Sequence, residues 1–180
     1  MAARPPLKVG VELGTTRVFA SAVDYPGWVR TGKTEDEAIA TLLSYRERYL
    51  AIAQRAGLAL PEFSTVEVVE RVEGNSTTNF GAPDRAFSFE AQKLTEAKAE
   101  QQTALLEACQ AEFDAIAADA PAILIKGPRG GGRDTDAVMA HVAEADEMAV
   151  KRKTWSAAYR TRRRAWHLTD HGWEIQDRSQ

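Results

Sequence analysis

Residues 7–23 read LKVGVELGTTRVFASAV. From Leu7 to Leu13 apolar side chains alternate with polar or small ones, the period of two that is typical of a half-buried strand. Gly14 and two threonines offer a turn, and residues 17–23 then predict a second strand that forms a hairpin with the first. Residues 65–72 are β-branched and alternate in a similar way, so they predict a third strand. The N-terminal part should therefore hold a small antiparallel sheet.

Four helices are expected after this hairpin. The first covers about 35–56, because Thr34 and Glu37 have the spacing of a capping box and Gly57 suits a helix end. The second begins at Thr95 and ends before Pro121. The third begins at Asp134 or Thr135, and the fourth covers about 156–177. Polar and glycine-rich segments at 74–84 and 126–133 predict loops, and the fold class expected is α+β.

Composition limits what the chain can be. Its 180 residues are 44% apolar and 27% charged, which is typical of an ordinary globular protein of one domain or two small ones. A single cysteine, Cys109, excludes a disulfide framework, and its place on an apolar helix stripe predicts a small buried side chain. The net charge of −3 argues against a general nucleic-acid binder. No membrane span or signal segment is expected, so the predicted location is the cytoplasm.

Three histidines are the strongest candidates for chemistry. His167 and His171 are four residues apart, so on a helix they share one face about one turn apart. His141 lies on the apolar face of the preceding helix. If the last two helices form a hairpin that turns near residue 154, His141 and His167 lie at the same level. Three imidazoles with an open position are typical of a catalytic metal site.

Two alternatives compete with this metal site. If the last two helices are one continuous rod, His141 and His167 lie ~39 Å apart at 1.5 Å per residue, which excludes a site within one chain. The histidines could also be structural, filling core or surface positions without a ligand.

Further residues could support a metal site. Carboxylates near the histidines in sequence could hold the imidazole tautomers; they are Glu144, Asp170 and Glu174. The glycine-rich segment 126–133 precedes a helix and could bind an anionic group, although it does not have the order of a P-loop, and a plain connector is the alternative. Its basic side chains are Lys126, Arg129 and Arg133.

The C-terminal 30 residues carry eight basic and three acidic side chains. The run Arg162-Arg163-Arg164 could contact RNA or DNA, or it could form salt bridges within the acidic remainder of the chain. Four aromatic residues at roughly helical spacing are expected to be core residues rather than a stacking platform; they are Trp155, Tyr159, Trp166 and Trp173.

The segments MAHVAEA (139–145) and RAWHLTDHGWEI (164–175) resemble the DinB/YfiT-like family of four-helix bundles. The likeness covers about 90–178. It implies a metal triad in which one histidine of an earlier helix joins an HxxxH pair on the last, and His141, His167 and His171 match those positions. The resemblance further implies a divalent metal (Zn, Ni or Fe) and thiol-dependent transferase, isomerase or metal hydrolase activity. This chain has only about ten residues, 150–159, where the family has a whole helix. Either the helix at 35–56 fills that place or the bundle is truncated.

The segments AVDYPGWV (22–29) and TGKTEDEA (31–38) resemble the HicB-type antitoxins, with Trp28 in place of the usual cysteine. The likeness covers about 7–72, and the whole chain resembles uncharacterised actinobacterial proteins that join these two parts. The expected division is therefore a HicB-like part at 1–80 and a DinB-like bundle at 81–180.

The function predicted on these grounds is a divalent-metal-dependent enzyme for a small-molecule substrate, with a low-molecular-weight thiol as a candidate co-substrate and a homodimer as a candidate assembly. The competing prediction is a non-catalytic, HicB-like binding or regulatory protein in which the histidines are structural.

Overall fold

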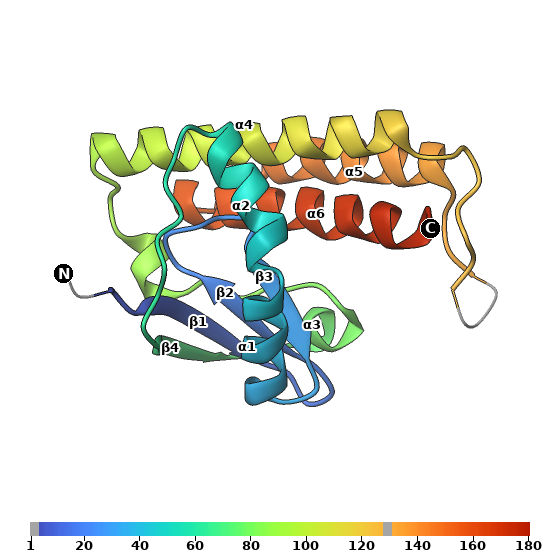
Figure 1. Cartoon of the computed structure of the whole chain (residues 1–180). Coiled ribbons are helices and arrows are strands. Elements are labelled where there is room, and N and C mark those ends of the chain that lie inside the picture. The colour runs from blue at the N-terminus through green and yellow to red at the C-terminus, as the bar shows by residue number, and fades with distance from the viewer. Residues whose placement is uncertain (1–3, 128–130) are drawn as a thin grey trace.

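The computed structural model describes residues 4–127 and 131–180 (Figure 1). Its elements follow in this order: β1 (Leu7–Leu13), β2 (Val18–Ala22), β3 (Val29–Gly32), α1 (Glu35–Ser44), α2 (Arg46–Arg55), β4 (Val66–Glu73), α3 (Ser76–Phe80), the 3-10 turn η1 (Ser88–Ala91), α4 (Glu96–Asp119), α5 (Thr135–Lys151) and α6 (Ala157–Arg178). The α+β class is confirmed, with one sheet in the N-terminal half and long helices in the C-terminal half.

The four strands form one mixed sheet in the order β3-β2-β1-β4. The predicted hairpin is confirmed, because β1 and β2 pair antiparallel from Val9–Ala22 to Leu13–Val18. The expectation of a wholly antiparallel sheet is wrong in one respect, since β4 pairs parallel with β1. The helices α1 and α2 carry the chain back between β3 and β4, and such a crossover is what a parallel pair requires.

Strand β1 is buried on both faces of the sheet. Its valines belong to the core cluster that contains Ala38 and Leu42 of α1. On the opposite face Gly10 lies beneath the ring of Phe87, and a Cβ at position 10 would lie 2.7 Å from that ring. Glycine is needed here because a side chain would push Phe87 and the 82–91 segment away from the sheet.

The three long helices lie together as a layer above the sheet, with α4 and α6 running in the same direction and α5 antiparallel to them (Figure 1). The bounds of α4, α5 and α6 agree closely with the predicted helices. Thr95 and Ser156 cap α4 and α6 by accepting from the backbone N–H groups of Lys98 and Tyr159.

The first predicted helix is two helices. Tyr45 leaves the helical conformation (φ −90°, ψ 6°), so α1 ends at Ser44 and α2 begins at Arg46. The break has a packing reason: α1 covers the sheet, whereas α2 turns to pack on α4. Tyr45 itself packs against Trp173 of α6, with ring centroids 5.0 Å apart.

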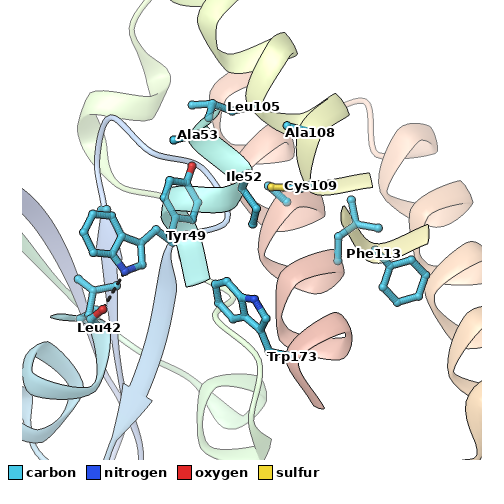
Figure 2. Close-up of a cluster of buried hydrophobic side chains, with 14 of the residues drawn as sticks. Leu42, Tyr49, Ile52, Ala53, Leu105, Ala108, Cys109, Phe113 and Trp173 are labelled. Atoms are coloured by element: carbon cyan, nitrogen blue, oxygen red, sulfur yellow. Dashed lines mark hydrogen bonds between the residues drawn. The ribbon is translucent and has the colours of Figure 1, made fainter. Parts of the chain in front are cut away.

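One apolar core joins the two halves of the chain (Figure 2). Tyr49 and Ile52 of α2 lie between the sheet and the helical layer, together with Cys109 of α4 and Trp173 of α6. Trp28, at the start of β3, stacks on Tyr49 at 5.3 Å between ring centroids, and its indole N–H donates to the carbonyl of Leu42. The helix α2 therefore contributes to the core that α4 and α6 share.

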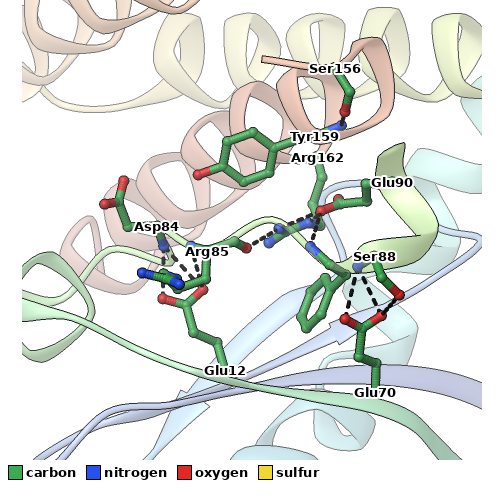
Figure 3. A network of polar contacts seen from close by, with 10 residues as sticks. Glu12, Glu70, Asp84, Arg85, Ser88, Glu90, Ser156, Tyr159 and Arg162 are labelled. Atoms are coloured by element: carbon green, nitrogen blue, oxygen red, sulfur yellow. Dashed lines mark hydrogen bonds and ion pairs between the residues drawn. The ribbon is translucent and has the colours of Figure 1, made fainter. Parts of the chain in front are cut away.

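The sequence predicts a loop at residues 74–84, but this segment contains the short helix α3. The buried carboxylate of Glu12 on β1 holds this segment. It accepts a hydrogen bond from the hydroxyl of Thr78 (2.5 Å). It also accepts hydrogen bonds from the backbone N–H groups of Asp84 and Arg85 (Figure 3). The segment is thus fixed above the sheet, where it faces α6.

None of the helices in the described ranges is both long and apolar enough to cross a membrane.

Candidate metal centre

The helices α5 and α6 form a hairpin that turns at residues 152–156. Of the two alternatives left open by the sequence, the continuous rod is therefore wrong. His141 of α5 and His167 of α6 each lie thirteen residues from position 154. Their imidazoles face each other, with ring centroids 4.9 Å apart.

The three histidines converge on one point. The Nε2 atoms of His141 and His167 are 3.2 Å apart, and one ring nitrogen from each of the three histidines lies within 4.8 Å of the others. Zn–N bonds of about 2.0–2.1 Å in a tetrahedral site place ligand nitrogens roughly 3.3 Å apart. The Nε2 atoms of His141 and His167 already have that spacing, and the ligand nitrogen of His171 lies within 4.8 Å of both histidines.

A carboxylate fixes the orientation of His171. Its Nδ1 lies 2.8 Å from Oε2 of Glu174, and the other oxygen of Glu174 accepts from the guanidinium of Arg178 at 2.7 Å. A carboxylate on Nδ1 favours the tautomer that carries its proton there and leaves the Nε2 lone pair available as a ligand. The hydrogen bond with His171, followed by the one from Arg178, holds the pKa of Glu174 below its usual range, so this partner is an anion at neutral pH.

Burial keeps the cluster in the form that a metal requires. Desolvation, helped by the nearby histidines and arginines, lowers the pKa of His167 to about 3. The pKa of His141 is lowered as well, first by burial and then by the charge of Arg133. Imidazoles bind metals only when they are unprotonated, so both rings are ready ligands at neutral pH.

The remaining predicted carboxylates lie elsewhere. Asp170 is paired with Arg30 of β3 (3.0 Å) and so links α6 to the sheet. Glu144 is exposed, and its charge only partly opposes the lowering of the His141 pKa. Among the three predicted carboxylates, Glu174 is therefore the one in contact with a histidine of the cluster.

Of the two basic residues of the glycine-rich segment that the structure describes, Arg133 lies at the site and Lys126 does not. Lys126 is paired with Asp134 (2.5 Å) and closes the base of the loop. Arg133 lies on the groove beside the histidines, and its charge lowers the pKa values of His141 and His167. Arg129 lies outside the described residues.

The cluster opens into a groove of about 1150 Å³ between the α5–α6 hairpin and the 75–86 segment. Ala145 and Ala149 of α5 line one wall, and their small side chains leave the space open. The opposite wall includes Phe80, which is exposed, and Asp84. A groove of this size can hold a small molecule beside a metal.

The arginines of the 162–164 run separate into three environments. Arg162 is buried against Glu90, with 6% and 4% of the two side chains exposed (Figure 3). Arg164 is paired with Asp146 of α5 through two bonds of 2.5 and 2.9 Å. Arg163 lines the groove. Two members of the run are therefore partners for acidic residues of the same chain.

Cys109 is buried, as predicted, and its surroundings exclude it as a nucleophile. Desolvation raises the pKa of the thiol to about 12, so the thiolate is scarce at neutral pH.

The sequence did not predict that residues 75–86 form a wall of the groove or that Arg163 lines it. The polar composition of 74–84 predicts a loop but carries no sign that Glu12 holds it above α6. Arg163 had a visible signal, since it lies four residues before His167 and thus on the same face of α6.

Comparisons of the chain with family models, with curated proteins and with solved structures gave no match.

Proposed function

We propose that this protein is a divalent-metal-dependent enzyme for a small-molecule substrate, with the metal held by His141, His167 and His171. The observation that carries the proposal is the convergence of three imidazole nitrogens within 4.8 Å from two helices. Buried polar groups are costly unless they are satisfied, and a cluster of three imidazoles placed side by side needs such a reason.

The donor set favours a transition metal. Imidazole nitrogens suit Zn, Ni and Fe, whereas Mg and Ca prefer oxygen ligands. Three protein ligands leave at least one coordination position for a substrate, which is typical of catalytic rather than structural sites. When bound, such an ion would act as a Lewis acid toward a carbonyl, a thiol or water.

Each part of the chain around the site has a definite task in this proposal. Glu174 orients His171 and is itself held by Arg178. Arg133 supplies positive charge beside the histidines. The alanine-lined wall of α5 and the 75–86 segment enclose the substrate in the groove. Since the groove runs along the helices beyond the histidines, it has room for a second small molecule such as a thiol.

The resemblance to DinB-like proteins supports thiol-dependent group transfer or hydrolysis as the reaction class, and it is the ground for naming a low-molecular-weight thiol as co-substrate. A cytoplasmic location and a homodimer remain predictions of the sequence.

The competing function is a non-catalytic HicB-like binding protein, which would use the edge of the sheet or the arginine run to hold a partner and in which the histidines would be structural. Arg162 and Arg164 are engaged with Glu90 and Asp146, which favours a role for this run in holding the chain together. The open groove at the histidines favours the enzyme.

Metal analysis tests the proposal. The chain, stripped with a chelator and dialysed against Zn²⁺, Ni²⁺ or Co²⁺, is expected to retain about one equivalent, and a His167→Ala/His171→Ala double variant to retain almost none. Co²⁺ should give the intense visible absorption of a low-coordinate nitrogen site in the parent chain only.

The chain offers no histidine outside the cluster for a control, because it has only three. Lys126→Ala serves instead, since Lys126 lies in the nearby loop and is paired with Asp134. If the parent chain and the double variant both retain negligible metal, the proposed metal site is wrong, and the proposed enzyme activity is wrong with it.

A further inference from the structure

One arginine beside the histidine cluster has no partner that accounts for its burial. The Nε and Nη1 atoms of Arg163 are inaccessible to solvent and make no hydrogen bond within the described residues. Its nearest acid is Asp84, whose Oδ1 lies 3.9 Å from Nη2 and thus beyond hydrogen-bond reach. Only 16% of the side chain is exposed.

Other arginines with a buried, unpartnered nitrogen differ from Arg163. Each of them makes at least one hydrogen bond through another nitrogen of the same guanidinium; they are Arg30, Arg46, Arg48, Arg160, Arg162 and Arg178. Arg163 makes none across the described ranges. A buried donor without an acceptor costs free energy, and a guanidinium carries a full charge as well. The missing acceptor is the feature that calls for a ligand.

The position of Arg163 shows where such an acceptor would come from. The side chain lines the groove, and its guanidinium lies over the rings of Trp166 and Trp155, at 5.1 and 5.8 Å from the ring centroids. These rings hold the planar group in place. On the neighbouring helix α5, Ala145 lies at the level of Arg163 in the hairpin, so a ligand meets only a small side chain from that helix there.

The groove is positively charged around this point. Arg85, Arg133 and Arg152 line it without an ion pair among the described residues. Of its acids, Asp146 and Asp170 are already paired with Arg164 and Arg30, and Asp84 accepts from the side-chain amide of Asn75 and lies 3.9 Å from Nη2 of Arg163. The three arginines without an ion pair outnumber this one remaining carboxylate, so an anion that enters the groove meets a net positive charge.

We infer that Arg163 binds an oxyanion group of the substrate, a carboxylate or a phosphate, about one helical turn from the metal position. The placement of this group relative to the metal rests on the proposed function, because the three histidines define the metal position. Arg163 and His167 are four residues apart on α6, so their backbone positions are separated by roughly 6 Å along the helix axis. A guanidinium can bind either oxyanion through two parallel N–H groups.

Tryptophan indole signals provide a local readout. The chain has four tryptophans. Trp155 and Trp166 contact Arg163, whereas Trp28 and Trp173 are buried in the core. Succinate and inorganic phosphate, each titrated at constant ionic strength into metal-free protein labelled with ¹⁵N at tryptophan, should shift the first pair of indole signals and leave the second pair in place.

Three variants sharpen the experiment. Arg163→Gln should weaken binding of the effective anion about tenfold or more, since it removes a charge-assisted hydrogen bond, and Arg163→Lys should recover part of the loss. Arg71→Gln is the matched control, because it removes the same charge from β4, where Arg71 is paired with Glu35 and does not line the groove. Unchanged signals of Trp28 and Trp173 report that each variant is folded.

Each outcome separates the two proposals. A shift with succinate alone identifies a carboxylate, and a shift with phosphate alone identifies a phosphate. No shift with either anion, or equal binding by the parent chain and Arg163→Gln, overturns the subsite even if the histidines bind metal. Loss of anion binding in Arg163→Gln with no metal bound by the parent chain would leave the oxyanion site standing and overturn the metal.

Discussion

Glu174 couples the histidine cluster to the end of α6. One of its oxygens meets Nδ1 of His171 and the other accepts from Arg178. The helix spacing makes both contacts local, at three and four residues. A carboxylate hydrogen-bonded to a ligating histidine increases metal affinity strongly, because it fixes the tautomer of the imidazole.

Replacement of this carboxylate should loosen the metal without removing a ligand. Glu174→Ala is expected to weaken Zn²⁺ affinity about 10–100-fold, measured by competition with a fluorescent chelator. Glu144→Ala is the control, since Glu144 is exposed and contacts none of the three rings. The same loss in both variants would show that general negative charge, rather than the contact with His171, supports the site.

Acid should destabilise the metal-free chain through His167. Its pKa is about 3 in the folded chain and near 6.5 when the group is free, so the unfolded chain binds the proton more strongly. The stability is complete above pH 6.5 and is lost as the pH falls from 6.5 toward 3, by at most about 1.4 kcal/mol per pH unit.

The variant His167→Gln has no such proton to bind. Urea unfolding of both chains at pH 7 and pH 5, with a chelator present, should show that the free energy of unfolding falls less in the variant than in the parent. Parallel losses in the two chains would contradict the lowered pKa.

At the scale of elements, local signals placed most boundaries and long-range contacts decided the rest. The caps at Thr95 and Ser156 and the apolar stripes gave α4 and α6, because these signals lie within a few residues of the ends they determine. Strand β3 is only four residues long and half polar, so periodicity could not find it. The break at Tyr45 depends on where α4 lies, which no local pattern contains.

The turn before β3 illustrates such a long-range contact. Gly27 has φ of +91°, and its carbonyl accepts from the hydroxyl of Thr169 on α6 (2.8 Å). A Cβ at this position would lie 2.8 Å from Sγ of Cys109 on α4. The turn is thus pressed against two helices at once.

Alanine substitutions at two glycines with positive φ allow the stability cost of backbone strain to be measured apart from the cost of crowding. Gly57 has φ of +70° with no atom within 4 Å of a Cβ, so Gly57→Ala should cost about 1–2 kcal/mol for the left-handed backbone alone. Gly27→Ala should cost roughly 2–5 kcal/mol, because overpacking adds to that strain. Denaturant unfolding measures both, and an equal cost would mean that the turn can move away from Cys109.

At the scale of the whole molecule, the core does not stop where the two resemblances meet. Trp28 and Tyr49 from the first 80 residues pack in the same cluster as Cys109 and Trp173 from the last 100. The buried pair of Glu90 and Arg162 adds a polar link between the 82–91 segment and α6. The sequence indicated both parts, but it could not show that α2 would lie between them.

This shared core predicts a single unfolding event. Calorimetry should give one transition in which the calorimetric and van't Hoff enthalpies agree, and the indole fluorescence and the far-ultraviolet circular dichroism should change together. Two separate transitions would mean that residues 1–80 and 81–180 are stable independently of each other.

Only the part of the candidate site that follows from residue spacing on helices could be predicted from the sequence. His167 and His171 follow from their separation of four residues, and His141 joins them once the turn near 154 is assumed. The wall at 75–86 depends on the contacts of Glu12 with Thr78, Asp84 and Arg85. Those contacts join residues more than 60 positions apart, so no periodic pattern in the sequence reveals them.

The packing of α5 has a kinetic consequence for a bound ion. Beyond its first residue, which bonds to the segment after α4, α5 packs chiefly on α6 within the described ranges. It supplies one imidazole, whereas α6 supplies two. Exit of the ion therefore requires only that α5 lift from its neighbour, and the residence time of the metal should follow the local opening rate of one helix. The same ion would slow amide hydrogen exchange along α5 and leave the sheet unaffected.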